Sequence, residues 1–382
     1  MVLLIQLNLY LNMSTKNNHI LFILKLPPPL TGATLMNKYI AESNLLKNNF
    51  NIKIIPVSYK KKINQISIHI KFIKVIFYHL ILLKDLLLFR PKIVYFQLSP
   101  LGYAFLRDCS YIIWLKVFKV HTIYHLHGKG INEAAKKTKI LKYMYTWAFK
   151  NSSVICLSNI LVSDISDVYF AKPYIVNNGI PNISIDFLER KNNNKIQVLF
   201  LSNLIYSKGI IDFLDSISLL RELYKEKLSV KIVGSEVEIN KFKLNYEISK
   251  RNINDLIEFL GPKYDKEKYE YLKYANVLVY PTLNDAFPIV ILEAMQFGIP
   301  VIATREGAIP EIIDDGITGF LVNKHSPGQI AEKLKILLDN DELRNKMEIA
   351  SRQKYLDKYT LDIFELNMKN IFESVLLTVQ IK

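Results

Sequence analysis

The sequence predicts an α/β protein with two domains. Short apolar runs typical of strands alternate with longer helix-like runs through both halves of the chain. The chain has 382 residues, which suggests two or three domains, and half of its residues are apolar, which is enough for two buried cores. Near residues 181–195 the sequence becomes charged and polar and loses its apolar periodicity. We therefore expect the crossover between the two domains there.

The positive charge of the chain is concentrated in its N-terminal half. The formal net charge is +15; residues 1–190 contain 24 Lys and Arg against 8 Asp and Glu, whereas residues 191–382 contain 26 against 27. No nucleic-acid-binding module is recognisable, and basic clusters such as Lys60, Lys61 and Lys62 stand close to aromatic and aliphatic runs. We expect an anionic membrane surface, and not nucleic acid, as the partner of this half.

Cysteine usage and the N-terminus predict a cytoplasmic protein. The two cysteines, Cys109 and Cys156, are too few for a disulfide framework or a zinc site, and Cys156 lies in an apolar run typical of the core. The first 12 residues are apolar but lack the positively charged region that opens a secretory signal. Because the first strand-like run follows soon after Met13, we expect translation to start at Met13.

The first predicted strand, residues 20–24, is followed by a proline-rich loop and a helix that begins near Ala33. Gly32 lies at the end of that loop. Glycine has no side chain and so permits a ligand to approach the backbone closely, but a glycine after prolines also serves simply as a turn. Both interpretations of Gly32 stay open at this point.

Residues 70–89 form an apolar, helix-like stretch into which Lys71, Lys74 and Lys84 are mixed. This pattern is typical of an interfacial helix on an anionic membrane, and the stretch carries too many charges to predict a membrane span. The alternative is a core helix that packs on the N-terminal sheet and extends its lysines to solvent.

His127 marks the end of a predicted strand. Apolar runs at residues 93–97 and 122–127 predict two further strands, and parallel sheets bind ligands at the carboxyl ends of their strands. His125 is two positions earlier and shares the face of His127. We favour His127 as a site residue because it lies at the strand end beside Gly128; a structural histidine is the alternative for either.

A short helix is predicted at residues 288–297. Pro288 is typical of a first helical turn, Gly298 is typical of the residue just past a helix end, and Pro300 prevents the helix from continuing.

Two carboxylates, Asp285 and Glu293, flank the start of this helix. Its first amides, including those of Phe287 and Ile289, are unsatisfied donors at the positive end of the helix dipole, which suits a diphosphate. Glu293 can accept two hydrogen bonds from a ribose, and Asp285 can contact the hydroxyls of a sugar beyond the phosphates. The alternative is that Asp285 caps the helix and Glu293 is a solvated helix residue.

The ordered motifs of the C-terminal half resemble those of the retaining glycosyltransferases of family 4, which have the GT-B fold. The resemblance extends over residues 198–322. The matching segments are the strand and Lys-Gly helix start at 198–210, the strand and glycine turn at 230–235, the strands at 257–261 and 275–281, the carboxylate pair Asp285 and Glu293, and the block at 307–322. In the N-terminal half, residues 154–159 and 174–181 resemble the last strands of the family's first domain.

The resemblance implies a role for each candidate site residue. It implies that Asp285 and His127 act at the transferred sugar. The donor-binding residues that it implies are Lys208, Glu293, Asn203, Phe287, Pro288, Ile289 and Gly32.

Three positions depart from the family pattern. Asp285 stands where the family has Glu, Ala308 stands where a second glycine is common, and Ser202 and Asn203 replace the Gly-Arg of the phosphate loop. The last change removes one of two cations expected on the diphosphate, and Asn does not replace that charge.

The resemblance also implies the architecture. It implies two Rossmann-like domains that face each other across a cleft: an acceptor-side domain at residues 1–185, a nucleotide-sugar domain at 186–360, and a last helix at 361–382 that crosses back to the first domain.

The implied reaction is transfer of a sugar from a nucleoside diphosphate sugar to an acceptor hydroxyl, with retained configuration, no cofactor and no metal. The leaving phosphate itself would serve as the base. The Asp-x-Asp sequence at Asp339 and Asp341 is better interpreted as a helix N-terminus.

The acceptor is inferred from composition. Enrichment in Lys, Asn and Ile indicates an AT-rich gene, as in many bacterial clusters for surface polysaccharides such as O-antigen or capsule. This association favours a lipid-linked oligosaccharide acceptor at the inner face of the cytoplasmic membrane. The alternatives are a catalytically weak sugar-nucleotide-binding subunit of a polysaccharide assembly complex, suggested by Asn203, and a GT-B nucleotide-sugar epimerase. A nicotinamide dehydrogenase is disfavoured because no Gly-x-Gly-x-x-Gly follows a strand.

Overall fold

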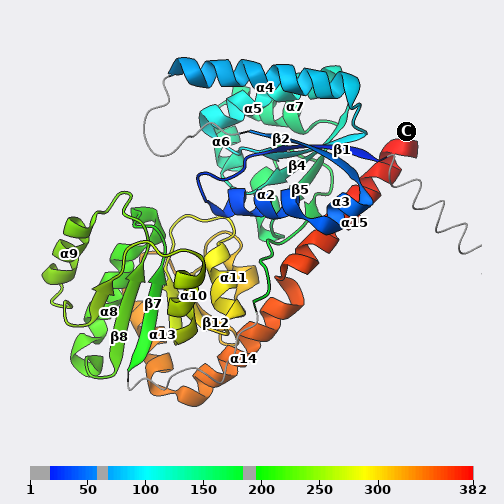
Figure 1. The fold of residues 1–382 in the computed structure, drawn as a ribbon. Coiled ribbons are helices and arrows are strands. Elements are labelled where there is room, and N and C mark those ends of the chain that lie inside the picture. Colours follow the sequence, from blue (N-terminus) through cyan, green and yellow to red (C-terminus); the bar gives the residue numbers. More distant parts are fainter. Residues whose placement is uncertain (1–17, 58–67, 184–194, 382) are drawn as a thin grey trace, which may run out of the picture. The chain divides into compact units, whose positions relative to one another are not determined.

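A computed structural model describes residues 18–57, 68–183 and 195–381, with the side chains of 68–72 left out (Figure 1). The chain divides into a first unit, Met1–Asn178 with Leu361–Lys382, and a second unit, Gly179–Thr360. The expected start at Met13, the cluster at Lys60 to Lys62 and most of the expected linker lie outside the described residues.

The first unit is built on a six-stranded parallel sheet with the strand order β2-β1-β3-β4-β5-β6. The strands are β1 (His19–Leu24), β2 (Asn51–Pro56), β3 (Ile93–Leu98), β4 (His121–Leu126), β5 (Ser153–Cys156) and β6 (Tyr174–Ile175). Every residue of β3 is buried, as expected for a central parallel strand covered on both faces. The strands predicted at residues 20–24, 93–97 and 122–127 are confirmed to within two residues at their ends.

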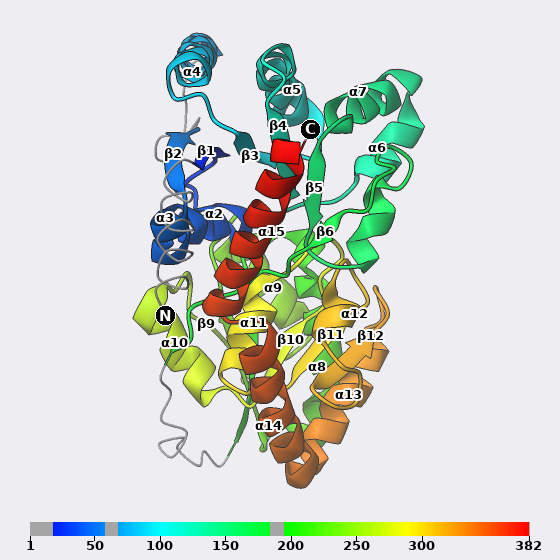
Figure 2. The same ribbon diagram turned by 90° about the vertical axis from the view of Figure 1, so that its right-hand side faces the viewer.

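Helices cover both faces of this sheet. Figures 1 and 2 show α4, α5 and α7 on one side of it and α2, α3 and α15 on the other. The helices are α2 (Gly32–Glu42), α3 (Asn44–Asn49), α4 (Ile68–Leu88), α5 (Gly102–Val117), α6 (Ile131–Lys137), α7 (Lys139–Phe149) and α15 (Leu361–Ile381), with a 3-10 helix η1 at Ile160–Ile165. The expected helix start near Ala33 is confirmed, because Thr31 caps α2 and Gly32 opens it.

The last helix, α15, packs on the first unit through aromatic contacts. Phe372 is fully buried, and its ring lies 5.6 Å from that of Phe22, 5.8 Å from that of Phe50 and 5.5 Å from that of Tyr95, measured between centroids. These rings come from β1, from the residue just before β2 and from β3, so the C-terminal segment completes the cover of a sheet whose six strands come from the N-terminal half.

The second unit repeats the plan with a six-stranded parallel sheet, in the order β12-β11-β10-β7-β8-β9. Its strands are β7 (Ile196–Leu201), β8 (Leu228–Val233), β9 (Ile257–Phe259), β10 (Val277–Tyr280), β11 (Val301–Thr304) and β12 (Gly319–Val322). The two parallel sheets confirm the predicted α/β class with two Rossmann-like domains.

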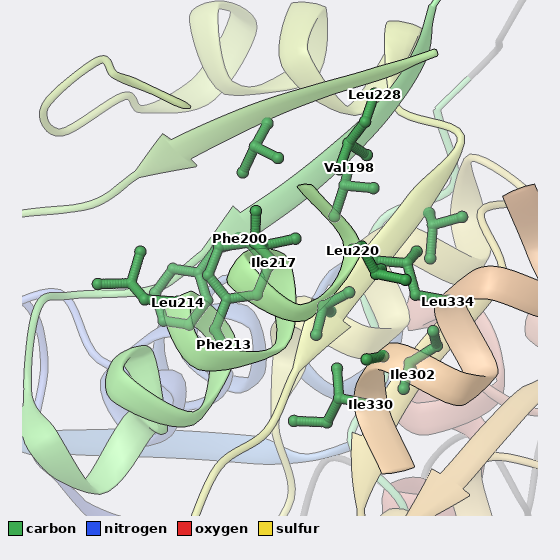
Figure 3. Close-up of a cluster of buried hydrophobic side chains, with 14 of the residues drawn as sticks. Val198, Phe200, Phe213, Leu214, Ile217, Leu220, Leu228, Ile302, Ile330 and Leu334 are labelled. Atoms are coloured by element: carbon green, nitrogen blue, oxygen red, sulfur yellow. The ribbon is translucent and has the colours of Figure 1, made fainter. Parts of the chain in front are cut away.

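The main core of the second unit lies between its sheet and two helices (Figure 3). Phe213 and Ile217 of α8 meet Val198 and Phe200 of β7, and Leu334 of α13 extends the cluster. The helices of this unit are α8 (Ile210–Tyr224), α9 (Lys241–Lys250), α10 (Asp265–Tyr274), α11 (Ile289–Gln296), α12 (Ile309–Ile312), α13 (Pro327–Asp339) and α14 (Asp341–Lys358), with the 3-10 helix η3 at Tyr206–Lys208. The predicted helix N-terminus at Asp339 to Asp341 is confirmed, because Asn340 caps α14.

The predicted helix at residues 288–297 is present but one residue shorter at each end. Pro288 is the N-cap of α11 and not a residue of its first turn, because its ψ of 115° is extended. Phe297 is the C-cap, and Gly298 follows with a φ of +67°, as expected for the residue that ends a helix.

Each sheet has one point at which the direction of strand addition reverses. In the first unit the chain adds β2 beside β1 and then continues on the other side of β1 with β3; in the second it adds β8 and β9 beside β7 and then continues with β10 on the other side. Helices that follow the two central strands leave opposite faces of such a sheet, which opens a crevice at the carboxyl ends. The pairs β1/β3 and β7/β10 therefore mark where each unit is built to bind a ligand.

Among the residues that the structure describes, no helix has both the length and the apolar character needed to cross a membrane.

Candidate functional site

The carboxyl ends of β7 and β10 bring Lys208 and Asp285 together. Lys208 ends the 3-10 turn that leads from β7 into α8, and Asp285 lies in the loop between β10 and α11. Their side chains form an ion pair, with 2.6 Å between Nζ and Oδ2, although 77 residues separate them in the sequence. Their side chains are 22% and 18% exposed, so the pair can be reached from solvent without being fully hydrated.

Tyr280, the last residue of β10, holds the same carboxylate. Its hydroxyl donates a hydrogen bond of 2.8 Å to Oδ2 of Asp285. Burial, and then the nearby Asp285 carboxylate, raise the pKa of Tyr280 well above its ordinary value, so the hydroxyl stays protonated and remains a donor. The Asp285 carboxylate is thus fixed by two donors before any ligand arrives.

Backbone hydrogen bonds fix the loop that carries Asp285. Leu283 N donates to the carbonyl of Ser207 at 2.8 Å, which ties the loop to the turn of Lys208. Ala308 N donates to the carbonyl of Ala286 at 2.8 Å, and Asp285 N donates to the carboxylate of Glu306 at 3.3 Å.

Two glycines allow these segments to approach each other. A Cβ at Gly209 would lie 1.9 Å from the carbonyl oxygen of Pro281, and one at Gly307 would lie 2.2 Å from the carbonyl oxygen of Asp285. Both residues have positive φ, of +77° and +52°. Any side chain at either position would push apart the loops that follow β7, β10 and β11 and displace the Lys208–Asp285 pair.

Glu293 lies in α11 and is paired with Lys268 of α10, with 2.5 Å between Oε1 and Nζ. Its side chain is only 12% exposed, so the interpretation of Glu293 as a solvated helix residue is wrong. The matching interpretation of Asp285 as a helix cap is also wrong, because Pro288 occupies the cap of α11 and no side chain bonds that cap.

Asn203 follows β7 and stabilises a neighbouring loop. Its Oδ1 accepts a hydrogen bond of 3.3 Å from Ser235 N, just past β8. A Cβ at Gly234 would lie 1.7 Å from the carbonyl oxygen of Ser202, so this glycine is required for the close approach. The amide of Asn203 thus connects two loops at the carboxyl edge, where the family has a cation.

Phe287, Pro288 and Ile289 form the entry to α11. All three are buried, and the ring of Phe287 packs against that of Tyr359 with centroids 6.2 Å apart. This packing fixes the position of the helix start, and the Lys208–Asp285 pair lies directly before it.

The remaining candidates, His127 and Gly32, belong to the first unit. His127 follows β4, and both of its ring nitrogens are buried without a hydrogen-bond partner. His125 lies inside β4, where the hydroxyl of Tyr95 is 2.6 Å from its Nδ1, which makes it a core residue. Gly32 is exposed as the first residue of α2.

Sequence reasoning missed Tyr280, Glu306 and Lys268. Tyr280 and Glu306 lie at or just beyond the carboxyl ends of β10 and β11, so their position at strand ends was the available signal. Glu306 is 4% exposed and pairs with Lys324. Lys268 lies on a polar helix, and nothing in the sequence distinguishes it from its neighbours.

No group of three or more His, Cys, Asp and Glu side chains within the described ranges is arranged to hold a metal ion.

We predict that Gly307→Ala lowers the free energy of unfolding by about 3 kcal/mol, because positive φ and a clash with the Asp285 carbonyl act together. Gly316→Ala is the matched control: its φ is +81°, but nothing lies within 4 Å of the added Cβ. It should lose only about 1 kcal/mol. Urea unfolding followed by circular dichroism measures both, and equal losses would show that the close approach is unimportant.

Burial, and then the nearby Lys25, lower the pKa of His127 from 6.5 to about 3. Protons then bind the unfolded chain more tightly than the folded one, so stability should fall as the pH drops below 6.5. Between pH 7 and 5 we expect the wild type to lose about 2 kcal/mol relative to His127→Gln. Fluorescence of Trp114 and Trp147, both in the first unit, reports the unfolding; parallel pH profiles for the two proteins would contradict the prediction.

Comparison with known sequences identifies relatives of this chain. Residues 183–354, all in the second unit, match the family described as "Glycosyl transferases group 1". The chain is 26% identical to an uncharacterized glycosyltransferase of Methanocaldococcus jannaschii over 274 residues, which are 72% of this chain and 74% of that protein. It is 30% identical to D-inositol 3-phosphate glycosyltransferase of Paenarthrobacter aurescens over 155 residues, 40% of this chain and 38% of the relative.

A solved structure shares the fold of the whole chain. The crystal structure of Anabaena HepE in complex with UDP has a TM-score of 0.70 and 16% sequence identity, over 93% of this chain and 100% of that one. This likeness shows the fold, and with the two parallel sheets it confirms the predicted GT-B architecture. Residues 183–354 therefore match the glycosyl transferases group 1 family, and the chain has the GT-B fold.

Proposed function

We propose that the protein transfers a sugar from a nucleoside diphosphate sugar to an acceptor hydroxyl, with retention of anomeric configuration. The observation that carries this proposal is the Lys208–Asp285 pair at the β7/β10 reversal point, directly before the N-terminus of α11. It sets a cation, a carboxylate and a helix N-terminus at one place, which suits a diphosphate with a sugar attached.

Lys208 and the first turn of α11 would hold the diphosphate. The ammonium of Lys208 already has one carboxylate partner, so a diphosphate that binds beside it completes its coordination without moving it. As the bond to the sugar breaks, negative charge grows on the leaving phosphate, and donors fixed in advance stabilise that charge by several kcal/mol. The amide of Asn203 brings no charge, so in this proposal Lys208 supplies the positive charge that stabilises the leaving phosphate.

Asp285 and Glu293 would hold the two sugars of the donor. Asp285, oriented by Lys208 and Tyr280, accepts hydrogen bonds from hydroxyls of the transferred sugar. Glu293, oriented by Lys268, accepts from the two ribose hydroxyls. The UDP in the complex of Anabaena HepE supports a uridine nucleotide as the first donor to test.

The leaving phosphate would take the proton of the attacking hydroxyl, on the same face from which it departs, which retains the configuration. Lys208 then balances the charge of the diphosphate product. His127, neutral at pH 7 because of its low pKa, would offer one N–H donor and one acceptor to a ligand at the carboxyl edge of its own sheet. In this mechanism neither a metal nor a cofactor takes part.

The donor is tested by calorimetry and thermal unfolding of the full chain with UDP, GDP, ADP and their common sugar conjugates, without and with metal. At 100 times the dissociation constant the correct nucleotide should add about 2.7 kcal/mol of stability. Glu293→Gln should weaken nucleotide binding about tenfold or more. Glu247→Gln is the matched control, since Glu247 is 14% exposed and paired with Arg251 in the same unit.

The outcome separates the alternatives. Metal-independent binding by one nucleotide class, lost in Glu293→Gln but not in Glu247→Gln, together with a retained linkage in the product by NMR, supports the transferase. Binding without turnover of any sugar conjugate would favour a binding subunit. Failure of every nucleotide to bind would overturn the proposed donor site.

The acceptor is proposed to be a lipid-linked oligosaccharide, because the first unit has an apolar outer face. In α4 the residues Ile73, Ile76, Phe77, Leu80 and Leu88 form one helical stripe and are 45–74% exposed. The opposite side of α4 packs on the unit through Leu82 and Leu86, as the core-helix interpretation required.

Two neighbouring helices continue this face. The ring of Phe105 in α5 stacks on that of Tyr145 in α7, with centroids 4.1 Å apart, and both helices lie with α4 on one side of the sheet (Figure 2). These two helices also carry large apolar residues that are at least 50% exposed, namely Ile113 and Val117 of α5 and Ile140 and Tyr143 of α7.

Lysines stand among these apolar residues. Lys84 lies within the α4 stripe, and Lys119, Lys139 and Lys142 are exposed on or beside α5 and α7. Apolar residues that insert between headgroups, ringed by lysines that contact anionic lipid, are the pattern of an interfacial surface. We propose that this face rests on the inner surface of the cytoplasmic membrane.

We predict that the full chain co-sediments with phosphatidylglycerol vesicles and that binding weakens as salt is added. Phe77→Asp with Leu80→Asp should weaken binding at least about tenfold, because two inserted apolar side chains are lost and two repelled charges are added. Leu219→Asp with Leu223→Asp in α8 is the control; these leucines are 62% and 74% exposed in the second unit. Equal binding by both double variants would exclude the α4 face.

A further inference from the structure

A second polar cluster lies at the reversal point of the first sheet. Lys25 follows β1 and Ser99 follows β3, the two strands between which the direction of strand addition reverses. Their side chains are hydrogen-bonded, Nζ to Oγ, across 74 positions of sequence. Lys25 thus occupies in the first unit the topological position that Lys208 occupies in the second.

One buried aspartate holds two cations at this place. Asp108, in α5, is 1% exposed; its Oδ1 contacts Nε of Arg107 at 2.9 Å and Nη2 at 2.5 Å, and its Oδ2 is 3.5 Å from Nζ of Lys25. Ser99 N donates to the same carboxylate at 2.8 Å. The three charged side chains together carry a net charge of +1.

The two cations keep access to solvent although the carboxylate does not. Lys25 is 26% exposed and Arg107 is 19% exposed. Burial lowers the pKa of Lys25, and Arg107 adds to the shift while Asp108 opposes it. An anion bound beside Lys25 and Arg107 would relieve the repulsion between them.

His127 supplies an independent sign of a ligand. It follows β4, the strand next to β3, and its two ring nitrogens are buried and unpartnered. Lys25 is near enough to lower the pKa of this histidine. A buried imidazole without hydrogen bonds costs free energy, which a ligand group at the same edge would recover.

We propose that the carboxyl edge of the first sheet binds a phosphate group through Lys25, Ser99 and Arg107, and that this phosphate belongs to the acceptor. An ammonium, a hydroxyl and a guanidinium are the donors that recognise phosphate oxygens. The assignment of the phosphate to the acceptor rests on the proposed transfer reaction, in which the second unit already provides Lys208 for the donor. The acceptor would then be a lipid phosphate or diphosphate that carries the glycan.

Hydrogen bonds from neighbouring elements fix the backbone of Lys25. Asn37 of α2 donates to the carbonyl of Lys25 at 2.8 Å and bonds the side chain of Gln97, so the backbone under Lys25 is fixed from both neighbouring elements. The first unit contains another ion pair between a lysine and a buried aspartate. Lys53, in the middle of edge strand β2, lies with its Nζ 2.5 Å from Oδ1 of Asp85 in α4. That pair has no counterpart of Ser99 and Arg107 among the ion pairs and hydrogen bonds of the described residues, and it serves as a control.

The test is calorimetric titration of the full chain with inorganic pyrophosphate, first alone and then with saturating UDP. We expect pyrophosphate to bind with UDP present, and Lys25→Met to weaken that binding at least about tenfold. Lys53→Met, which likewise removes a lysine that pairs with a buried aspartate, should bind like the wild type. Ser99→Ala, which removes a hydroxyl and no charge, should weaken binding about fivefold.

The outcomes distinguish this site from the donor site. If UDP or Lys208→Met abolishes pyrophosphate binding, the anion binds in the second unit and the inference is overturned. Wild-type affinity of Lys25→Met for pyrophosphate, or no pyrophosphate binding at all, would also overturn it. Farnesyl diphosphate should compete with pyrophosphate, and failure to compete would overturn the lipid acceptor. If UDP does not bind but Lys25-dependent pyrophosphate binding persists, the proposed donor fails while the phosphate site stands.

Discussion

The reversal of strand order in each parallel sheet is the constraint on which the site depends. All strands of a sheet point the same way, so every strand's carboxyl end reaches one edge, and the reversal opens that edge between two central strands. At β7/β10 the edge receives Lys208 and Asp285; at β1/β3 it receives Lys25 and Ser99. A sheet with antiparallel strands would distribute these residues to opposite edges.

Both edges have the same arrangement of side chains, in which a cation is held by a carboxylate that other groups keep in place. In the second unit Tyr280 and Lys208 both contact Oδ2 of Asp285. In the first unit Asp108 is almost fully buried and holds Lys25 with Arg107. A cation positioned in this way needs little reorganisation when a phosphate arrives, which is the condition for strong electrostatic stabilisation. The units differ in net charge: the Lys208–Asp285 pair is neutral and the Lys25–Arg107–Asp108 cluster is positive. In the proposed mechanism, phosphate binding by the second unit would therefore rely more on the N-terminus of α11.

The departures from the family pattern have local structural explanations. Asp285 is one methylene shorter than the usual glutamate, yet it reaches both Lys208 and Tyr280, and Gly307 lets the next loop pack directly against its backbone. Asn203 stands where the family has an arginine; it supplies no positive charge, but its side chain accepts a hydrogen bond from the loop after β8. The apolar outer face of α4 has a different origin: one side of the helix packs on the core through Leu82 and Leu86, and the apolar stripe on the opposite side is left exposed.

The sequence by itself determined the elements and their class. The alternation of apolar runs located the strands, and proline and glycine limited α11 to within one residue at each end, because these features depend on neighbours in the chain. The order of motifs indicated the family that residues 183–354 match. Only the tertiary structure decided the partners: Lys208 with Asp285, Glu293 with Lys268, and Lys25 with Ser99. Such pairs join segments 25 to 77 residues apart, and which segments meet is set by strand order and by close glycine contacts, which leave no local pattern in the sequence.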